Sequence, residues 1–142
     1  MKIVSACLAG INCRYDGKSK PNGKISDIVK KGEAIAVCPE ELGGLPTPRP
    51  AAEQVKNKVI NNKGEDITEQ FYKGANLALA IAEENNCTEA ILKCKSPMCG
   101  KGEVYDGSFS GTLTEGEGIF AKLLNEKGVK VITEVEFENN KE

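Results

Sequence analysis

The 142-residue sequence contains no histidine. This absence excludes serine–histidine and cysteine–histidine nucleophilic pairs, zinc bound by histidine, and general acid–base catalysis by imidazole. Any proton transfer must therefore be carried out by a carboxyl group, a lysine, a tyrosine or a thiol.

Tryptophan is also absent, and the aromatic residues amount to three tyrosines and four phenylalanines. So few aromatic side chains argue against an extended platform that stacks nucleic-acid bases. The formal net charge of −2 gives no general reason to expect a nucleic-acid or membrane partner. No apolar run approaches the ~18 residues that a membrane-spanning helix needs.

The N-terminus has one lysine followed by a strand-like segment, and it lacks the long apolar stretch and cleavage site of a signal peptide. We therefore predict a cytoplasmic protein in a reducing environment. Six cysteines in that setting favour metal binding or catalysis over disulfide bonds. The chain length predicts one compact domain, residues 1–142.

Short apolar segments alternate with amphipathic ones along the chain. Strands are predicted at residues 2–6, 34–37, 89–93 and 129–135, and helices at 24–31 and 66–84. A third helix is predicted to start at the capping pair Thr114 and Glu117 and to end at Gly128. This alternation predicts the α/β class, with a three-layer, Rossmann-like arrangement of a mostly parallel sheet and helices on both faces.

Three further features are expected from local sequence signals. Asp66 and Glu69 have the spacing of a helix-capping pair. Residues 55–60 suggest a hairpin with a turn at 61–64, and the C-terminal tail, which is rich in Asn, Lys and Glu, should be frayed. Residues 38–50, rich in proline and glycine, are predicted to form a rigid, irregular loop.

Cysteines follow three of the predicted strands. Cys7 comes directly after the first strand, Cys38 after the second, and Cys94 and Cys99 lie around the end of the third. The carboxyl ends of parallel strands meet at one edge of a sheet, where such folds bind ligands. We therefore predict a shared metal or iron–sulfur site at this edge.

The cysteine spacing shows neither the paired C-x-x-C knuckles of structural zinc nor the pattern of ferredoxins. Ordinary burial as a small apolar residue is a credible alternative for Cys87 and Cys94, but a poor one for the cysteines in loops: Cys7, Cys13, Cys38 and Cys99. Three widely separated thiolates suit a cubane cluster with one open iron, and soft thiolates select iron–sulfur or zinc.

Several polar residues accompany these cysteines. Glu40 follows Cys38 after one proline, and it is either a proton-transferring carboxyl or part of a solvated acidic turn. Ser96 either hydrogen-bonds a small ligand or caps a turn, and turn capping is the simpler interpretation. Arg14 and Arg49, the only arginines, either bind an anion or join loops by ion pairs.

The tripeptide Tyr-Asp-Gly occurs twice, at residues 15–17 and 105–107, and each copy follows a cysteine-containing loop. Chance or turn chemistry is the simpler explanation of this repeat.

Four segments, at residues 4–17, 37–49, 92–100 and 105–111, together resemble the thiouracil desulfidase (TudS) family, long catalogued as a domain of unknown function. The resemblance covers nearly the whole chain in order. Met98 stands where a second serine is common in the family, and Cys94 stands where cysteine is unusual.

This resemblance implies a [4Fe-4S] cluster held by Cys7, Cys38 and Cys99, with the fourth iron open to the sulfur of a thiouracil. Water would replace that sulfur without net redox change, giving uracil and hydrosulfide. Glu40 and Ser96 match family positions assigned to proton transfer and substrate activation. Cys13 is either a supporting thiol or the ligand in place of Cys7.

The predicted substrate is a thiolated pyrimidine: free thiouracil, a thiolated nucleoside or a thiolated tRNA base. The acidic chain and the few aromatic residues disfavour tRNA, whereas the lysines at positions 18, 20 and 24 keep it open. The alternatives are a carrier of sulfur or of iron–sulfur clusters, and a structural zinc domain. No membrane partner is predicted, and the sequence leaves the oligomeric state open.

Overall fold

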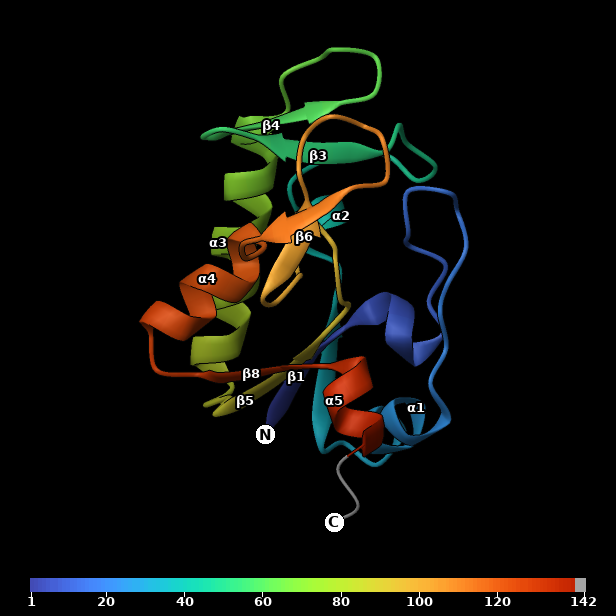
Figure 1. The fold of residues 1–142 in the computed structure, drawn as a ribbon. Helices are drawn as coiled ribbons and strands as arrows, with labels where there is room; N and C mark the ends of the chain where they lie inside the picture. Colours follow the sequence, from blue (N-terminus) through green and yellow to red (C-terminus); the bar gives the residue numbers. More distant parts are fainter. Residues whose placement is uncertain (140–142) are drawn as a thin grey trace.

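A four-stranded parallel sheet lies at the centre of the molecule (Figure 1). In this computed structural model, which describes residues 1–139, its strands are β1 (Lys2–Ser5), β2 (Ala34–Val37), β5 (Glu89–Leu92) and β8 (Lys130–Thr133). They lie in the order β2-β1-β5-β8, and every neighbouring pair is parallel. The chain therefore adds strands on both sides of β1, which creates a switch point between β1 and β5.

Helices cover both faces of the sheet (Figure 1). On one face, α3 (Thr68–Glu84) and α4 (Ile119–Glu126) belong to the same core cluster as Ile3 and Ala90. On the other face, α1 (Gly23–Lys30) and α5 (Glu134–Asn139) belong to a second cluster with Val4 and Ile91. Successive strand residues thus point to opposite faces. The predicted α/β class, with a parallel sheet between helical layers, is confirmed.

The longest helix is amphipathic, as the alternating sequence pattern predicts, because α3 buries one face formed by Phe71, Ala75, Ala78, Leu79 and Ala82. The start of this helix differs from the prediction. Asp66 Oδ1 accepts hydrogen bonds from the backbone N–H of Thr68, at 3.0 Å, and from its hydroxyl, at 2.6 Å. Asp66 therefore forms a local turn with Thr68 and makes no capping pair with Glu69.

The last strand is shorter than predicted, and a helix that the sequence analysis missed follows it. β8 ends at Thr133, and Val135 lies in α5. Thr133 Oγ1 accepts from the Glu136 N–H at 3.1 Å, and Glu136 Oε1 accepts from the Thr133 N–H at 3.1 Å. This reciprocal capping box starts the helix and ends the strand. The tail predicted to fray follows residue 135; its residues 136–139 are helical in α5, so that part of the prediction is wrong, and residues 140–142 lie outside the described part of the chain.

Two antiparallel hairpins lie outside the main sheet. β3 (Ala52–Val55) pairs with β4 (Lys58–Asn61), and β6 (Glu103–Tyr105) pairs with β7 (Leu113–Glu115). The first hairpin was predicted with the wrong turn: the chain reverses between Val55 and Lys58, and residues 61–64 form a separate turn.

The second hairpin was not predicted. Thr114, expected to cap a helix, lies in β7 and pairs with Val104 of β6, and α4 begins only after Gly118. A side chain at Gly118 would place its Cβ only 2.4 Å from the carbonyl carbon of Met98, so this entry to α4 requires glycine.

A short helix, α2 (Pro39–Leu42), lies in the loop predicted to be irregular. It packs closely against α3, because a Cβ at Gly74 would come within 1.7 Å of the Pro39 carbonyl oxygen and a Cβ at Gly43 within 2.0 Å of the Gln70 carbonyl oxygen. These two glycines fix α2 over the end of β2.

None of the helices within residues 1–139 has the length and apolar character needed to cross a membrane.

Candidate functional site

A cavity of about 390 Å³ opens where β1, β2 and β5 end. Its walls include Ser5 and Val37, the last residues of β1 and β2, and Lys93, the first residue after β5. Residues of β3 and β6 complete the wall. The cavity therefore lies at the carboxyl edge of the sheet, beside the switch point between β1 and β5, where open α/β sheets bind ligands.

Five of the six free cysteines line this cavity: Cys7, Cys13, Cys38, Cys94 and Cys99. Cys87, which the sequence analysis placed outside the group, is buried after α3 and does not line the cavity. The structure thus brings together thiols that are far apart in sequence, at the edge where they were expected.

The three cysteines expected to bind the cluster come from three loops and lie close to one another. Cys7 lies in the short helix η1 (Ala6–Ala9), Cys38 directly precedes α2, and Cys99 ends a turn after β5. Burial is the main reason that the pKa of Cys7 is raised to about 11; the positive charge of Lys93 opposes the rise, and the neighbouring Cys38 adds to it. Burial also raises the pKa of Cys99 well above its usual value, with added contributions from Cys7 and Cys38. Each of these thiols therefore influences the ionisation of another.

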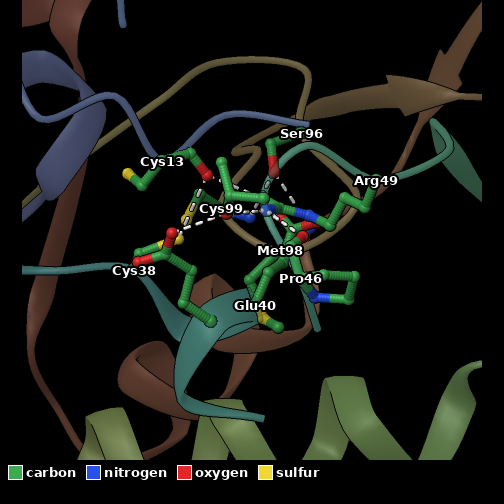
Figure 2. A network of polar contacts seen from close by, with 10 residues as sticks. Cys13, Cys38, Glu40, Pro46, Arg49, Ser96, Met98 and Cys99 are labelled. Carbon is green, nitrogen blue, oxygen red and sulfur yellow. Dashed lines mark hydrogen bonds and ion pairs between the residues drawn. The ribbon is translucent and has the colours of Figure 1, made fainter. Parts of the chain in front are cut away.

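Cys13 is the direct neighbour of Cys38 (Figure 2). As a thiol, Cys38 donates to the carbonyl oxygen of Cys13, with 3.6 Å between sulfur and oxygen. A hydrogen bond with the Cys13 side chain, together with one from the Glu41 backbone N–H, lowers the pKa of Cys38. The same interaction and burial raise the pKa of Cys13. Cys38 is thus the more readily ionised of the two, as expected for a thiol at the N-terminal end of a helix.

Cys94 lies in a separate polar cluster on the cavity wall, just beyond the end of β5. Its sulfur is 3.4 Å from Lys93 Nζ and 3.4 Å from Glu134 Oε2, and Glu134 Oε1 accepts from its N–H at 2.8 Å. Lys93 and Glu134 form an ion pair of 3.1 Å. Burial alone would lower the pKa of Lys93, but the nearby Glu134 and Cys94 side chains have the larger combined effect, so the net shift of the pKa is upward. This ion pair was not predicted from the sequence, because the fourth strand was expected to continue through Glu134 to residue 135, whereas β8 ends at Thr133.

Glu40 faces the cavity and is held there by Arg49. The Glu40 side chain is 20% exposed, and its Oε1 lies 3.3 Å from Arg49 Nε. Burial raises the pKa of Glu40, and the positive charge of Arg49 partly offsets that shift. Glu40 is therefore not the solvated turn residue considered as an alternative.

Arg49 joins the loops around the site, as the ion-pair interpretation predicted (Figure 2). Its side chain is only 4% exposed. Besides Glu40, its guanidinium donates to the Thr47 hydroxyl at 2.9 Å and to the carbonyl oxygens of Pro46 and Cys13 at 3.2 and 2.9 Å. One side chain therefore fixes both the Cys13 loop and the Glu40 carboxylate.

Ser96 caps the turn that carries Cys99. Its hydroxyl oxygen accepts from the backbone N–H groups of Met98, at 3.1 Å, and Cys99, at 3.0 Å. Turn capping is thus the role that these contacts show. Ser96 also lines the cavity, and these two hydrogen bonds do not use its hydroxyl proton.

Arg49→Lys is expected to lower the free energy of unfolding by about 2–3 kcal/mol, because lysine cannot reproduce the forked donor set and leaves buried acceptors without partners. Urea unfolding followed by circular dichroism measures this loss. The matched control is Arg14→Lys. Arg14 is 21% exposed, and it forms a 3.5 Å ion pair with Asp16 and lies 5.5 Å from the centre of the exposed Tyr15 ring; lysine can keep both contacts, so we expect a change within about 0.5 kcal/mol. Equal effects of the two substitutions would contradict the role given to Arg49.

The donor set fits an iron–sulfur cluster by its chemistry. Within residues 1–139, no three cysteine, aspartate or glutamate side chains are arranged so as to hold a single metal ion. The thiols are instead spread around a cavity of about 390 Å³, and three of them come from loops that follow three strands. Thiolates distributed in this way are soft ligands that iron–sulfur clusters accept.

Fold and site together define an α/β protein with a thiol-lined crevice at the carboxyl edge of its sheet, suited to soft metals and to sulfur. The model of the 2-thiouracil desulfurase family matches residues 3–136. The chain belongs to this family, which confirms the resemblance found in its motifs.

Two relatives illustrate the match. The protein YbbK of Bacillus subtilis (strain 168), whose name describes it as uncharacterized, is 42% identical over 146 residues, which cover 96% of this chain and 97% of YbbK. The solved structure of a [4Fe-4S]-dependent thiouracil desulfidase, TudS, is also 42% identical and superposes with a TM-score of 0.91, covering 96% of this chain and 92% of TudS.

Proposed function

We propose that this protein is a [4Fe-4S]-dependent desulfidase that converts a thiolated pyrimidine, with thiouracil as the first candidate, to its oxo form. The net reaction consumes one water, replaces the C=S bond by C=O and releases hydrosulfide, without net oxidation or reduction. The observation that carries the proposal is the set of thiols around one cavity, in a chain 42% identical to a [4Fe-4S]-dependent thiouracil desulfidase.

Cys7, Cys38 and Cys99 are the proposed cluster ligands, because each follows a different strand of the sheet and each lines the cavity. Three protein ligands leave one iron open. When bound, the cluster supplies a soft Lewis acid for the thiocarbonyl sulfur. Cys13, next to Cys38, is the proposed supporting thiol, and its replacement of Cys7 as a ligand is the alternative.

Glu40 is the proposed proton-transfer group. Its Oε1 is engaged by Arg49, whereas Oε2 takes part in none of the hydrogen bonds or ion pairs found in residues 1–139. A carboxyl group held in this way has one oxygen available to take a proton from the attacking water and to return it to the product. Arg49 is a positioning residue in this scheme.

Ser96 is the proposed activating donor to the substrate. Its oxygen is held by two backbone N–H groups, so its own proton is free to point into the cavity. The proposal also includes the cytoplasm as the site of activity, because a reducing environment suits six free thiols.

The test is anaerobic reconstitution with iron and sulfide, followed by the loss of thiocarbonyl absorbance from 2- and 4-thiouracil. We expect uracil and hydrosulfide in equal amounts, formed only by protein that carries the cluster. A reconstituted cluster without turnover would redirect the search to thiolated nucleosides and tRNA, and then to a carrier. Failure to take up iron would refute the cluster and favour zinc.

A further inference from the structure

The repeated Tyr-Asp-Gly tripeptide forms two turns of the same kind beside the cavity. Asp16 Oδ1 accepts from the N–H of Lys18 at 3.0 Å, and Asp106 Oδ1 accepts from the N–H of Ser108 at 2.9 Å. The glycines that follow have φ angles of 76° and 91°, which favour glycine. The repeat is therefore turn chemistry, as the simpler explanation held, and each turn brings an aromatic residue to the cavity wall.

Three of the seven aromatic side chains line the cavity: Tyr15, Tyr105 and Phe109. Tyr15 is 43% exposed and Phe109 is 40% exposed, so both rings keep a free apolar surface beside the cavity. Two exposed aromatic rings therefore lie at the wall of this cavity, although aromatic residues are few in the chain. Such rings gain contact area when a flat ligand covers them.

The backbone at Phe109 is held in a conformation that a bulky residue rarely adopts, with φ at 56°. Glu53 Oε1 maintains it by accepting from the N–H groups of Gly107, at 3.0 Å, and Phe109, at 3.2 Å. The neighbouring Gln54 amide donates to the Pro97 carbonyl oxygen at 2.9 Å, within the turn that carries Ser96. The Phe109 loop is therefore fixed relative to the proposed reacting groups.

The backbone of Tyr15 is fixed to Arg49, the residue that holds Glu40. The Tyr15 carbonyl oxygen accepts from the backbone N–H of Arg49 at 2.8 Å. The Arg14 guanidinium lies 5.5 Å from the centre of the Tyr15 ring. Two loops that are distant in sequence thus carry aromatic rings, one linked through Arg49 to Glu40 and the other through β3 to the turn that carries Ser96.

We propose that Tyr15 and Phe109 are specificity-determining residues that stack on the substrate ring and select a planar, unsaturated pyrimidine over thiocarbonyl compounds of other shapes. This inference rests on the proposed function, because it assigns the ring of the thiolated pyrimidine to these two side chains. Stacking on an aromatic side chain requires a flat π-face and depends little on the edge groups of the base.

The experiment compares the binding of uracil and 5,6-dihydrouracil to the cluster-reconstituted protein by isothermal titration calorimetry. Both ligands carry the same carbonyl and N–H groups, but only uracil is a planar, unsaturated ring. We expect the wild-type protein to prefer uracil, and Tyr15→Leu and Phe109→Leu each to weaken uracil binding about tenfold with little change for dihydrouracil.

The matched control is Tyr72→Leu, because Tyr72 is 45% exposed on α3 and does not line the cavity. This variant should keep the wild-type preference. Iron content and circular dichroism show whether each variant is folded and loaded. A wild-type protein that does not distinguish the two rings would overturn the proposal, and so would leucine variants that keep the preference or lose both ligands equally.

Failure of this inference and failure of the proposed function give different results. Uracil contains no sulfur, so its binding does not depend on turnover. Protein that desulfurates thiouracil while its leucine variants keep the ring preference would refute only the stacking role. Protein that prefers uracil through Tyr15 and Phe109 but releases no hydrosulfide from thiouracil would refute only the proposed reaction.

Discussion

Replacing Cys7, Cys38 or Cys99 by serine, one at a time, is expected to abolish both iron–sulfur binding and turnover. Serine has almost the same size, but its oxygen is harder than a thiolate sulfur and stays protonated at neutral pH. Changing an outer-shell partner of a metal ligand already costs roughly 10–100-fold in affinity or activity, so losing a ligand should cost more than ~100-fold. Iron and sulfide content after anaerobic reconstitution, measured beside thiouracil turnover, checks this result.

Two other cysteines provide matched controls. Cys87 is buried but does not line the cavity, so Cys87→Ser tests the effect of placing a hydroxyl in the core. Cys94 lines the cavity but contacts Lys93 and Glu134, so Cys94→Ser tests a thiol of the same wall outside the proposed ligand set. Both variants should retain the cluster. Iron loss in Cys94→Ser as complete as in Cys7→Ser would contradict the assignment.

Cys13→Ser decides between the two roles considered for Cys13. As a supporting thiol, Cys13 acts on Cys38 through their contact, so its loss should lower turnover while most of the iron remains. If Cys13 were the ligand in place of Cys7, Cys13→Ser would lose the iron and Cys7→Ser would keep it.

The position of the thiols was predictable because it depends on a general property of parallel sheets. Cys7 and Cys38 directly follow apolar strands, and the carboxyl ends of parallel strands always meet at one edge. The convergence of the thiols depends only on the direction and order of the strands. The exact strand bounds, several of which were predicted wrongly by one or two residues, do not affect it.

The contacts that complete the site were not predictable from local sequence. Arg49 reaches the Cys13 carbonyl oxygen, and Lys93 pairs with Glu134, across long separations along the chain. Composition counts the aromatic residues but does not say that Tyr15 and Phe109 line the same cavity. The β6–β7 hairpin was missed for the same reason, since its pairing places Thr114 in a strand against a local capping pattern.

Glu40→Gln is expected to lower turnover by roughly 10²–10⁴-fold, the usual contribution of a positioned proton-transfer group, while the iron content stays unchanged. Glutamine keeps the length of the side chain, and its carbonyl oxygen can still accept from Arg49 Nε. The amide cannot take up and release a proton in the way that a carboxyl group does. The loss should therefore appear in kcat, measured with saturating thiouracil, because the substrate contacts remain.

The control is Glu41→Gln, which removes the same charge one residue further along α2. Glu41 is exposed, and its carboxylate accepts from the Thr47 hydroxyl outside the cavity wall, so turnover should change little. The pair of variants also separates an enzyme from a carrier of sulfur. A carrier would still transfer sulfide after Glu40→Gln, because transfer of a bound sulfide needs the thiols but no proton-transferring carboxyl. An enzyme would keep its cluster and stop releasing uracil, whereas iron loss in Glu40→Gln alone would assign Glu40 to holding the loop after Cys38.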